Sequence, residues 1–145
     1  MIRSQILCVD DEPLVLSALE RTLGRDSWRV IAVVDGREAL DLLDRPSIKV
    51  VVADQRMPRM LGSELLAETR KRRPDVGRII LTAYPGPDVL VRGLEAQVDF
   101  LIAKPWNEDQ LRRAVRRLIG EVDRGRAREA ERPGEAWRDL GGEGG

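Results

Sequence analysis

Short apolar runs alternate along the chain with longer segments in which apolar residues recur every three or four positions. The runs are rich in β-branched residues and apolar on both sides, which is typical of strands buried in a parallel sheet. We predict such strands at residues 5–9, 29–34, 49–53, 78–82 and 99–103. The longer segments predict amphipathic helices at residues 13–23, 36–45, 61–73, 88–96 and 108–122.

These elements follow one another as strand then helix, repeated along the chain. Strands that alternate with helices form a parallel sheet with right-handed crossovers and helices on both faces. We therefore predict an α/β fold, a doubly wound five-stranded parallel sheet, in one domain of residues 1–122. From residue 123 onward glycine, arginine and glutamate dominate. Residues 123–145 are therefore predicted to be a charged tail or linker stub that is flexible or extends the last helix.

Composition excludes several classes of site. The net charge is zero, with 25 basic and 25 acidic residues, which argues against direct nucleic-acid binding by this chain. The absence of histidine excludes histidine-based catalytic triads and histidine-ligated zinc. The single cysteine, Cys8, excludes an internal disulfide and is predicted to be a core residue in a reducing compartment, so we expect the cytoplasm. No apolar run reaches the roughly 18 residues that span a bilayer, so no membrane association is expected.

The run Val50–Ala53 leads directly into a carboxylate, Asp54. Pro58 cannot continue a strand ladder, so the strand must end near Asp54. Open α/β sheets bind ligands beyond the carboxyl ends of their strands, which makes Asp54 the leading candidate for a functional residue.

Polar side chains also follow the other predicted strands. The candidates, in chain order, are Asp10, Asp11, Asp54, Thr82 and Lys104. Because the carboxyl ends of parallel strands share one edge, these side chains can converge. Clustered carboxylates suit a hard divalent cation such as Mg²⁺ or Mn²⁺, while a lysine and a threonine can hold phosphoryl oxygens. The set predicts a site that forms and holds an aspartyl phosphate, with Asp54 as nucleophile.

This combination resembles the receiver domain of two-component response regulators over residues 4–122. The resemblance is carried by Val9–Glu12, Asp54 with Met57, Pro58 and Gly62, Leu81–Ala83, and Lys104 with Pro105. It implies a (βα)5 flavodoxin-like fold and phosphotransfer from a sensor histidine kinase or a phosphotransfer protein. It also implies a cis peptide before Pro105 and Mg²⁺ bound by Asp10, Asp11, Asp54 and the backbone carbonyl of Arg56.

The resemblance further implies how such a module signals. The motifs are most similar to receivers that precede enhancer-type activators or cyclic-dinucleotide phosphodiesterase domains, so a removed output domain or a separate downstream protein is the expected partner. The family commonly signals through its fourth helix, fifth strand and fifth helix, a face that could also form a homodimer. The last helix carries outward arginines that are either a solvated face or a partner surface: Arg112, Arg113, Arg116 and Arg117.

Two features depart from the family pattern. Leu101 stands where an aromatic residue usually couples to the threonine, and Phe100, one position earlier, should point to the opposite face of the sheet. Arg56 and Tyr84 are bulky and flank the position from which water would attack the aspartyl phosphate. We therefore expect slow dephosphorylation, with Tyr84 shielding the phosphorus.

Two other functions compete with the signalling module. A Mg²⁺-dependent phosphatase of the haloacid-dehalogenase type needs a second aspartate two residues after the nucleophile, and Arg56 stands there, so we predict that the chain is not an enzyme. A phosphorylation-independent scaffold with the same fold remains open, because Leu101 replaces the usual aromatic residue.

Overall fold

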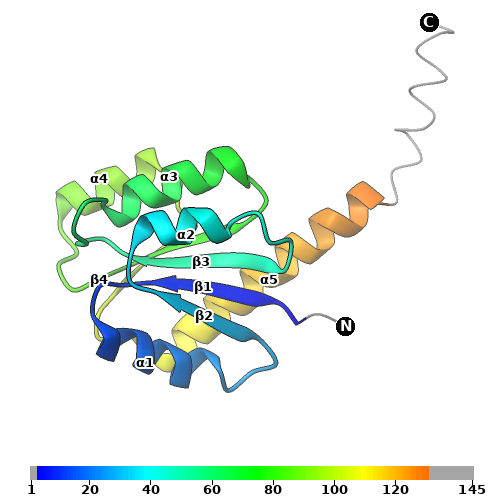
Figure 1. Ribbon diagram of the computed structural model, residues 1–145, viewed down its shortest axis with the longest axis horizontal. Helices are drawn as coiled ribbons and strands as arrows, with labels where there is room; N and C mark the ends of the chain where they lie inside the picture. The colour runs from blue at the N-terminus through cyan, green and yellow to red at the C-terminus, as the bar shows by residue number, and fades with distance from the viewer. Residues whose placement is uncertain (1–2, 131–145) are drawn as a thin grey trace, which may run out of the picture.

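The computed structural model describes residues 3–130. In this range the chain forms one parallel sheet whose strands are β1 (Gln5–Val9), β2 (Arg29–Val33), β3 (Ile48–Asp54), β4 (Gly77–Thr82) and β5 (Phe100–Ala103). The helices are α1 (Pro13–Leu23), α2 (Gly36–Leu42), α3 (Gly62–Arg72), α4 (Pro87–Glu95) and α5 (Glu108–Ala130). The predicted doubly wound five-stranded parallel sheet is confirmed, and Figure 1 shows its helices on both faces.

The strand order is β2-β1-β3-β4-β5, and every neighbouring pair is parallel. The chain first winds from β1 to β2 and then returns to add β3 on the other side of β1. The direction of winding therefore changes between β1 and β3. In open α/β sheets this switch point leaves a crevice beyond the carboxyl ends of the two strands, and ligands bind there. Asp10 follows β1 and Asp54 ends β3, so the topology places both carboxylates at the switch point.

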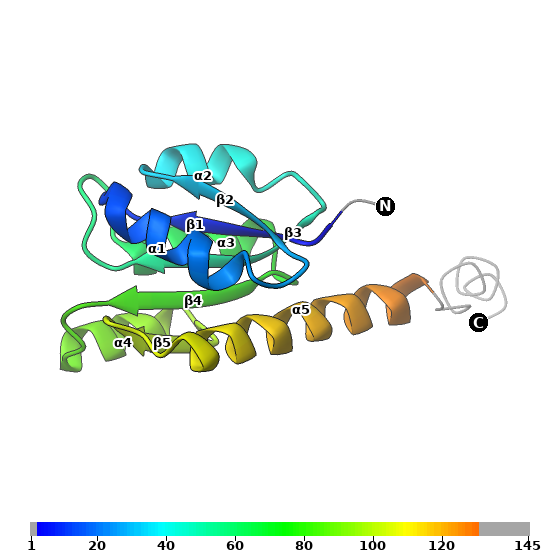
Figure 2. The same cartoon turned by 90° about the horizontal axis from the view of Figure 1, so that it is seen from below.

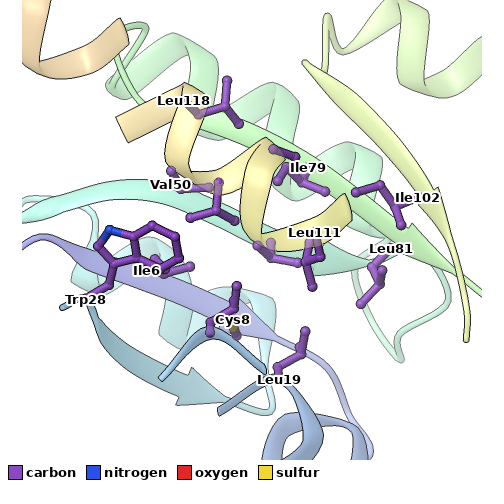
Figure 3. Close-up of a cluster of buried hydrophobic side chains, with 14 of the residues drawn as sticks. Ile6, Cys8, Leu19, Trp28, Val50, Ile79, Leu81, Ile102, Leu111 and Leu118 are labelled. Atoms are coloured by element: carbon purple, nitrogen blue, oxygen red, sulfur yellow. The ribbon is translucent and has the colours of Figure 1, made fainter. Parts of the chain in front are cut away.

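The alternation of side chains along the strands builds two cores. On one face, residues of the sheet pack beneath α1 and α5; on the other, they pack beneath α2, α3 and α4. Along β3, Val50 and Val52 belong to the first core and Val51 and Ala53 to the second. Figure 3 shows the first core, in which Cys8 is fully buried as predicted. Burial raises the pKa of the Cys8 thiol far above its ordinary value, so this residue is inert packing.

The last turns of α5 lie in the region predicted to be a flexible tail or an extension of the last helix. Its predicted apolar stripe is buried throughout, with Leu111, Ala114, Val115, Leu118, Ile119 and Val122 in contact with the sheet. Beyond this stripe the helix continues without a break to Ala130 and runs past the edge of the sheet (Figure 2). The predicted division after residue 122 thus falls inside one helix and stays a prediction. Residues 131–145, the rest of the predicted tail, lie outside the described residues.

The local signals at helix ends agree with the structure. Asp35 caps α2 by accepting a hydrogen bond from the backbone N–H of Arg37, and Asn107 caps α5 by accepting one from Gln110. Pro13 occupies the first position of α1, where its missing N–H costs nothing. Among residues 3–130 there is no helix with the length and apolar character to cross a bilayer.

Candidate functional site

A lysine and two carboxylates meet at the carboxyl edge of the sheet. Lys104, which follows β5, places its Nζ 2.8 Å from Oδ2 of Asp10 and 3.1 Å from Oδ1 of Asp54. Lys104 is 94 positions from Asp10 and 50 positions from Asp54 in the chain, so only the sheet topology brings them together. Asp10 and Asp54 are buried, and little of the Lys104 side chain is exposed. The expected convergence of strand ends is thus observed for Asp10, Asp54 and Lys104.

Backbone hydrogen bonds fix these side chains in place. The N–H of Asp10 donates to the carbonyl of Val33, and the N–H of Lys104 donates to the carbonyl of Thr82. Each bond extends the parallel ladder by one residue beyond its strand. The peptide between Lys104 and Pro105 is cis, as the resemblance implied.

The charges in this crevice do not balance. Burial raises the pKa of Asp54, and the negative charges of Asp10 and Asp11 raise it further, while the hydrogen bond from Lys104 opposes the shift. Burial alone would lower the pKa of Lys104, but its hydrogen bonds to Asp10 and Asp54 hold that pKa above its ordinary value. Lys104 thus stays protonated, and its single ammonium donates hydrogen bonds to both carboxylates. The residual negative charge favours a further cation.

Three consecutive acidic residues provide oxygen ligands at the same place. Carboxylate oxygens of Asp10, Asp11 and Glu12 all lie within 4.8 Å of one another. Asp10 is oriented by the N–H of Glu12, which donates to its Oδ1 at 2.9 Å. Hard carboxylate oxygens, some of them exposed, suit Mg²⁺, which keeps several of its waters. Glu12 was not among the predicted ligands, although three acids in a row after a strand already indicate its position.

Thr82 ends β4 and is buried, but its hydroxyl is occupied locally. Its Oγ1 accepts a hydrogen bond from the backbone N–H of Tyr84 at 3.2 Å. This is a turn contact that shapes the loop after β4. The hydroxyl hydrogen remains free to point elsewhere, so the contact is compatible with Thr82 donating to a ligand.

Arg56 and Tyr84, the two bulky residues expected to flank the site, contact each other. The guanidinium carbon of Arg56 lies 4.6 Å from the centroid of the Tyr84 ring, within the range of a cation–π interaction. Tyr84 is 62% exposed, so the stacked pair stands at the surface rather than in the core. It joins the loop after β3 to the loop after β4.

The departure at β5 has the expected geometry. Leu101 packs in the core beneath α2, α3 and α4, whereas Phe100 packs in the core beneath α1 and α5. The aromatic ring thus lies on the opposite face of the sheet from Leu101, as the two-residue period predicted.

Gln55 is a buried residue that was not among the predicted site residues. Its side-chain amide makes two hydrogen bonds to Ser63 at the start of α3. Its only sequence signal is a long polar side chain directly after an apolar strand, next to the candidate nucleophile.

Known proteins match the chain over most of its length. A family model described as "Response regulator receiver domain" matches residues 6–116. The hydrogenase transcriptional regulatory protein HoxA of Cupriavidus necator is 38% identical over 118 residues, which make up 81% of this chain and 24% of HoxA. The transcriptional regulatory protein GlrR of Escherichia coli is 34% identical over 113 residues, 77% of this chain and 25% of GlrR. The chain thus spans about a quarter of the length of these two relatives.

Solved structures agree with these sequence relatives. A CheY-like response regulator receiver domain from Methanospirillum hungatei superposes with a TM-score of 0.79 at 27% identity, covering 86% of this chain and 99% of that one. The signal receiver domain of an HD domain-containing protein from Pseudomonas fluorescens gives the same TM-score and identity, covering 84% and 98%.

Proposed function

The chain belongs to the response regulator receiver domain family, and we propose that it accepts a phosphoryl group on Asp54 in a Mg²⁺-dependent reaction and signals through a conformational change. The observation that carries the proposal is the contact of Lys104 with both Asp10 and Asp54. It joins the expected nucleophile, an expected metal ligand and an expected phosphate contact in one cluster at the switch point of the sheet.

The residues of the cluster have complementary roles in this reaction. A carboxylate oxygen of Asp54 attacks the phosphorus of a phosphohistidine, the P–N bond breaks, and its electron pair leaves with the donor imidazole. Lys104, already within hydrogen-bond distance of Asp54, donates to an oxygen of the transferred group, and the Thr82 hydroxyl donates to another. Mg²⁺, held by Asp10, Asp11, Asp54 and the backbone carbonyl of Arg56, would neutralise charge on the phosphoryl group.

The phosphoryl donor is a protein partner in this proposal. Because the described chain lacks histidine, the phosphohistidine must be supplied by a sensor kinase or a phosphotransfer protein. The receiver then acts on a downstream protein or on an output domain joined to it, and we propose that it works in the cytoplasm. Its relatives HoxA and GlrR are both named transcriptional regulatory proteins and are about four times as long as the region they share with this chain.

The face formed by α4 and β5 is our candidate for the signalling surface. Leu90, Val91 and Leu94 of α4 are all more than half exposed, and a groove of about 150 Å³ lies between α4 and β5. Asp88 and Glu95 on α4 are exposed, as are arginines on the neighbouring α5. In a two-fold dimer every contact between two different residues occurs twice, once in each direction. Acids on α4 of each copy can therefore face arginines on α5 of the other copy. We therefore propose a second copy of the chain as the occupant of this face.

Phosphoryl uptake from acetyl phosphate tests the proposed function. We expect the parent protein to incorporate one phosphoryl group only when Mg²⁺ is present, and Asp54→Asn to incorporate none. Asp26→Asn is the matched control, because Asp26 also binds a cationic side chain, Arg112, but lies in the loop between α1 and β2. Absence of uptake by the parent under conditions that label another receiver would overturn the proposal in favour of the scaffold alternative.

A further inference from the structure

Gln55 joins the two ends of the loop that follows the candidate nucleophile. It comes directly after Asp54 and is only 3% exposed. Its Oε1 accepts a hydrogen bond from the backbone N–H of Ser63 at 2.8 Å, and its Nε2 donates to the Ser63 hydroxyl at 3.0 Å. Ser63 is itself buried, so water cannot replace either bond. We call this pair the Gln55–Ser63 bracket.

The bracket does the work of a helix cap. The first N–H groups of an α-helix have no partner within the helix, and the residue before the helix usually satisfies one of them. Here that residue is Leu61, whose aliphatic side chain cannot accept a hydrogen bond. Gln55 supplies the missing acceptor from the other side of the loop, and it thereby fixes the start of α3 to the end of β3.

A close backbone contact reinforces the bracket. The N–H of Gly62 donates to the carbonyl of Gln55 at 3.0 Å. A Cβ at position 62 would lie 2.3 Å from the carbonyl oxygen of Asp54, so only glycine allows this approach. The peptide between Asp54 and Gln55 is therefore held between the strand ladder and the first turn of α3.

The segment between these anchors carries Arg56, whose backbone carbonyl is a proposed ligand of Mg²⁺. Arg56 is the next residue after Gln55, so any displacement of Gln55 also shifts the Arg56 carbonyl. Mg²⁺ demands near-ideal octahedral geometry and tolerates little displacement of a ligand. Residues that orient metal ligands affect affinity strongly even though they do not touch the ion.

We propose that Gln55 is a positioning residue for the metal site, acting through Ser63 to hold the Arg56 carbonyl where Mg²⁺ requires it. The inference rests on the proposed function, because it assumes that the ion binds at the carboxyl edge of the sheet. Breaking the Gln55–Ser63 bracket should therefore weaken metal binding more than a comparable loss of fold stability elsewhere on α3 does.

Binding of Mn²⁺ to the full chain, without any phosphoryl donor, tests this role. Electron paramagnetic resonance measures free Mn²⁺ directly and needs no catalytic turnover. Gln55→Met fills a similar volume but cannot accept from Ser63, and we expect it to weaken Mn²⁺ binding about tenfold, at the lower end of such orienting effects. Ser63→Ala removes only the hydroxyl arm of the bracket, so an intermediate loss of about threefold is expected, and this milder variant tests the idea if Gln55→Met folds poorly.

Thr69→Val is the matched control for general destabilisation. Thr69 is buried on the same helix, and its hydroxyl donates to the carbonyl of Leu65 at 2.8 Å, away from the loop. We expect its dissociation constant for Mn²⁺ to stay within about twofold of the parent value, well below the effect of removing an orienting partner. Equal losses in Thr69→Val and Gln55→Met would overturn the inference, and so would an unchanged constant in Gln55→Met. A parent protein that binds no Mn²⁺ would instead overturn the proposed metal site and the inference with it.

Discussion

The two edges of the sheet use charged side chains in opposite ways. At the carboxyl edge, Asp10 and Asp54 share a single ammonium from Lys104, and two further acids stand exposed beside them. At the amino edge, Arg73 and Arg78 are surrounded by acceptors. Arg73 donates to the carbonyls of residues 43, 45 and 48 and to a carboxylate, and Arg78 donates to the carbonyls of residues 74, 76 and 97.

This asymmetry follows from the winding of the chain. In a strand–helix repeat every helix begins at the carboxyl edge of the sheet and ends at the amino edge. Helix N-termini carry partial positive charge and favour acids, whereas helix C-termini carry partial negative charge and favour arginines. The fold therefore permits acids at one edge and arginines at the other. At the amino edge the arginines are held by carbonyl and carboxylate acceptors and stabilise the fold. At the carboxyl edge the carboxylates outnumber the single ammonium of Lys104, which leaves negative charge available for chemistry.

The largest effect is expected when the amino edge is broken. Arg78→Met would leave three carbonyl oxygens at the start of β4 and before β5 without their hydrogen-bond donor. We therefore expect a loss of about 3 kcal/mol in the free energy of unfolding. Urea denaturation at pH 7 measures it. Arg70→Met, on the exposed face of α3, is the control and should change stability by less than about 0.5 kcal/mol. A similar small loss in Arg78→Met would show that these contacts are incidental.

The next effect concerns water at the carboxyl edge. Removing the ring of Tyr84 also removes the stack with Arg56, which would open the aspartyl phosphate to attack. We expect Tyr84→Ala to lose its phosphoryl group about tenfold faster, equivalent to about 1.4 kcal/mol in the barrier. Decay of the phosphorylated protein after removal of acetyl phosphate measures the rate. Tyr84→Phe keeps the stacked ring and should decay like the parent, whereas a Tyr84→Ala protein that decays no faster would count against shielding.

Removing a charge at the carboxyl edge should stabilise the fold, the reverse of the result at the amino edge. Asp54→Asn relieves repulsion from Asp10 and Asp11 and keeps an oxygen that can accept from Lys104. We expect a gain of about 1 kcal/mol at pH 7 in the absence of divalent cations, the usual scale of a single substitution.

Added Mg²⁺ should cancel that gain. At a concentration ten times its dissociation constant, a ligand that binds only the native state adds about 1.4 kcal/mol to the parent protein. We therefore expect Asp54→Asn to be the more stable protein without Mg²⁺ and the parent to be the more stable with it. Urea denaturation under both conditions measures this reversal. If Asp54→Asn is less stable than the parent without Mg²⁺, the contact with Lys104 outweighs the repulsion among the carboxylates and the contrast between the edges fails.

Local patterns were sufficient to predict most of the fold. Strand periodicity placed Leu101 and Phe100 on opposite faces, and single capping residues such as Asp35 and Asn107 located helix starts, because each of these signals acts within a few residues. The main candidate site residues could be named because strand ends in a parallel sheet share an edge. Their phosphoryl and metal roles remain predictions.

The features that escaped prediction depend on loop conformation. Gln55 and Ser63 are eight residues apart across a loop, where neither the strand period nor the helix period applies, and their contact exists only because the loop between them folds back. The arginines of the amino edge bind backbone carbonyls. Every residue has a carbonyl, so the sequence does not indicate which of them a loop will turn toward an arginine. The sequence left open whether the chain beyond residue 122 extends the last helix, because the last turns of α5 bury no apolar stripe and instead carry an ion pair between Arg126 and Asp75.

The smallest effect is expected from a pair that fastens this extension. Arg126 on α5 donates to Asp75, which also accepts from Arg73. Burial alone would raise the pKa of Asp75, but the hydrogen bonds from the two arginines outweigh it and hold that pKa below its ordinary value. A carboxyl group with a lowered pKa in the folded state contributes stability above its unfolded pKa of about 3.9, and this contribution is lost as the pH falls through the folded pKa.

Asp75→Asn should therefore cost about 0.5 kcal/mol at pH 7, the range of partly exposed ion pairs, and the difference from the parent should shrink as the pH falls below the unfolded pKa of about 3.9. Urea denaturation at several pH values measures the convergence. Phosphoryl uptake should be unchanged, because Asp75 lies at the opposite edge from Asp54. A cost that persists at low pH would mean that Asp75 acts by packing rather than by charge, and that the amino edge is stabilised by something other than paired charges.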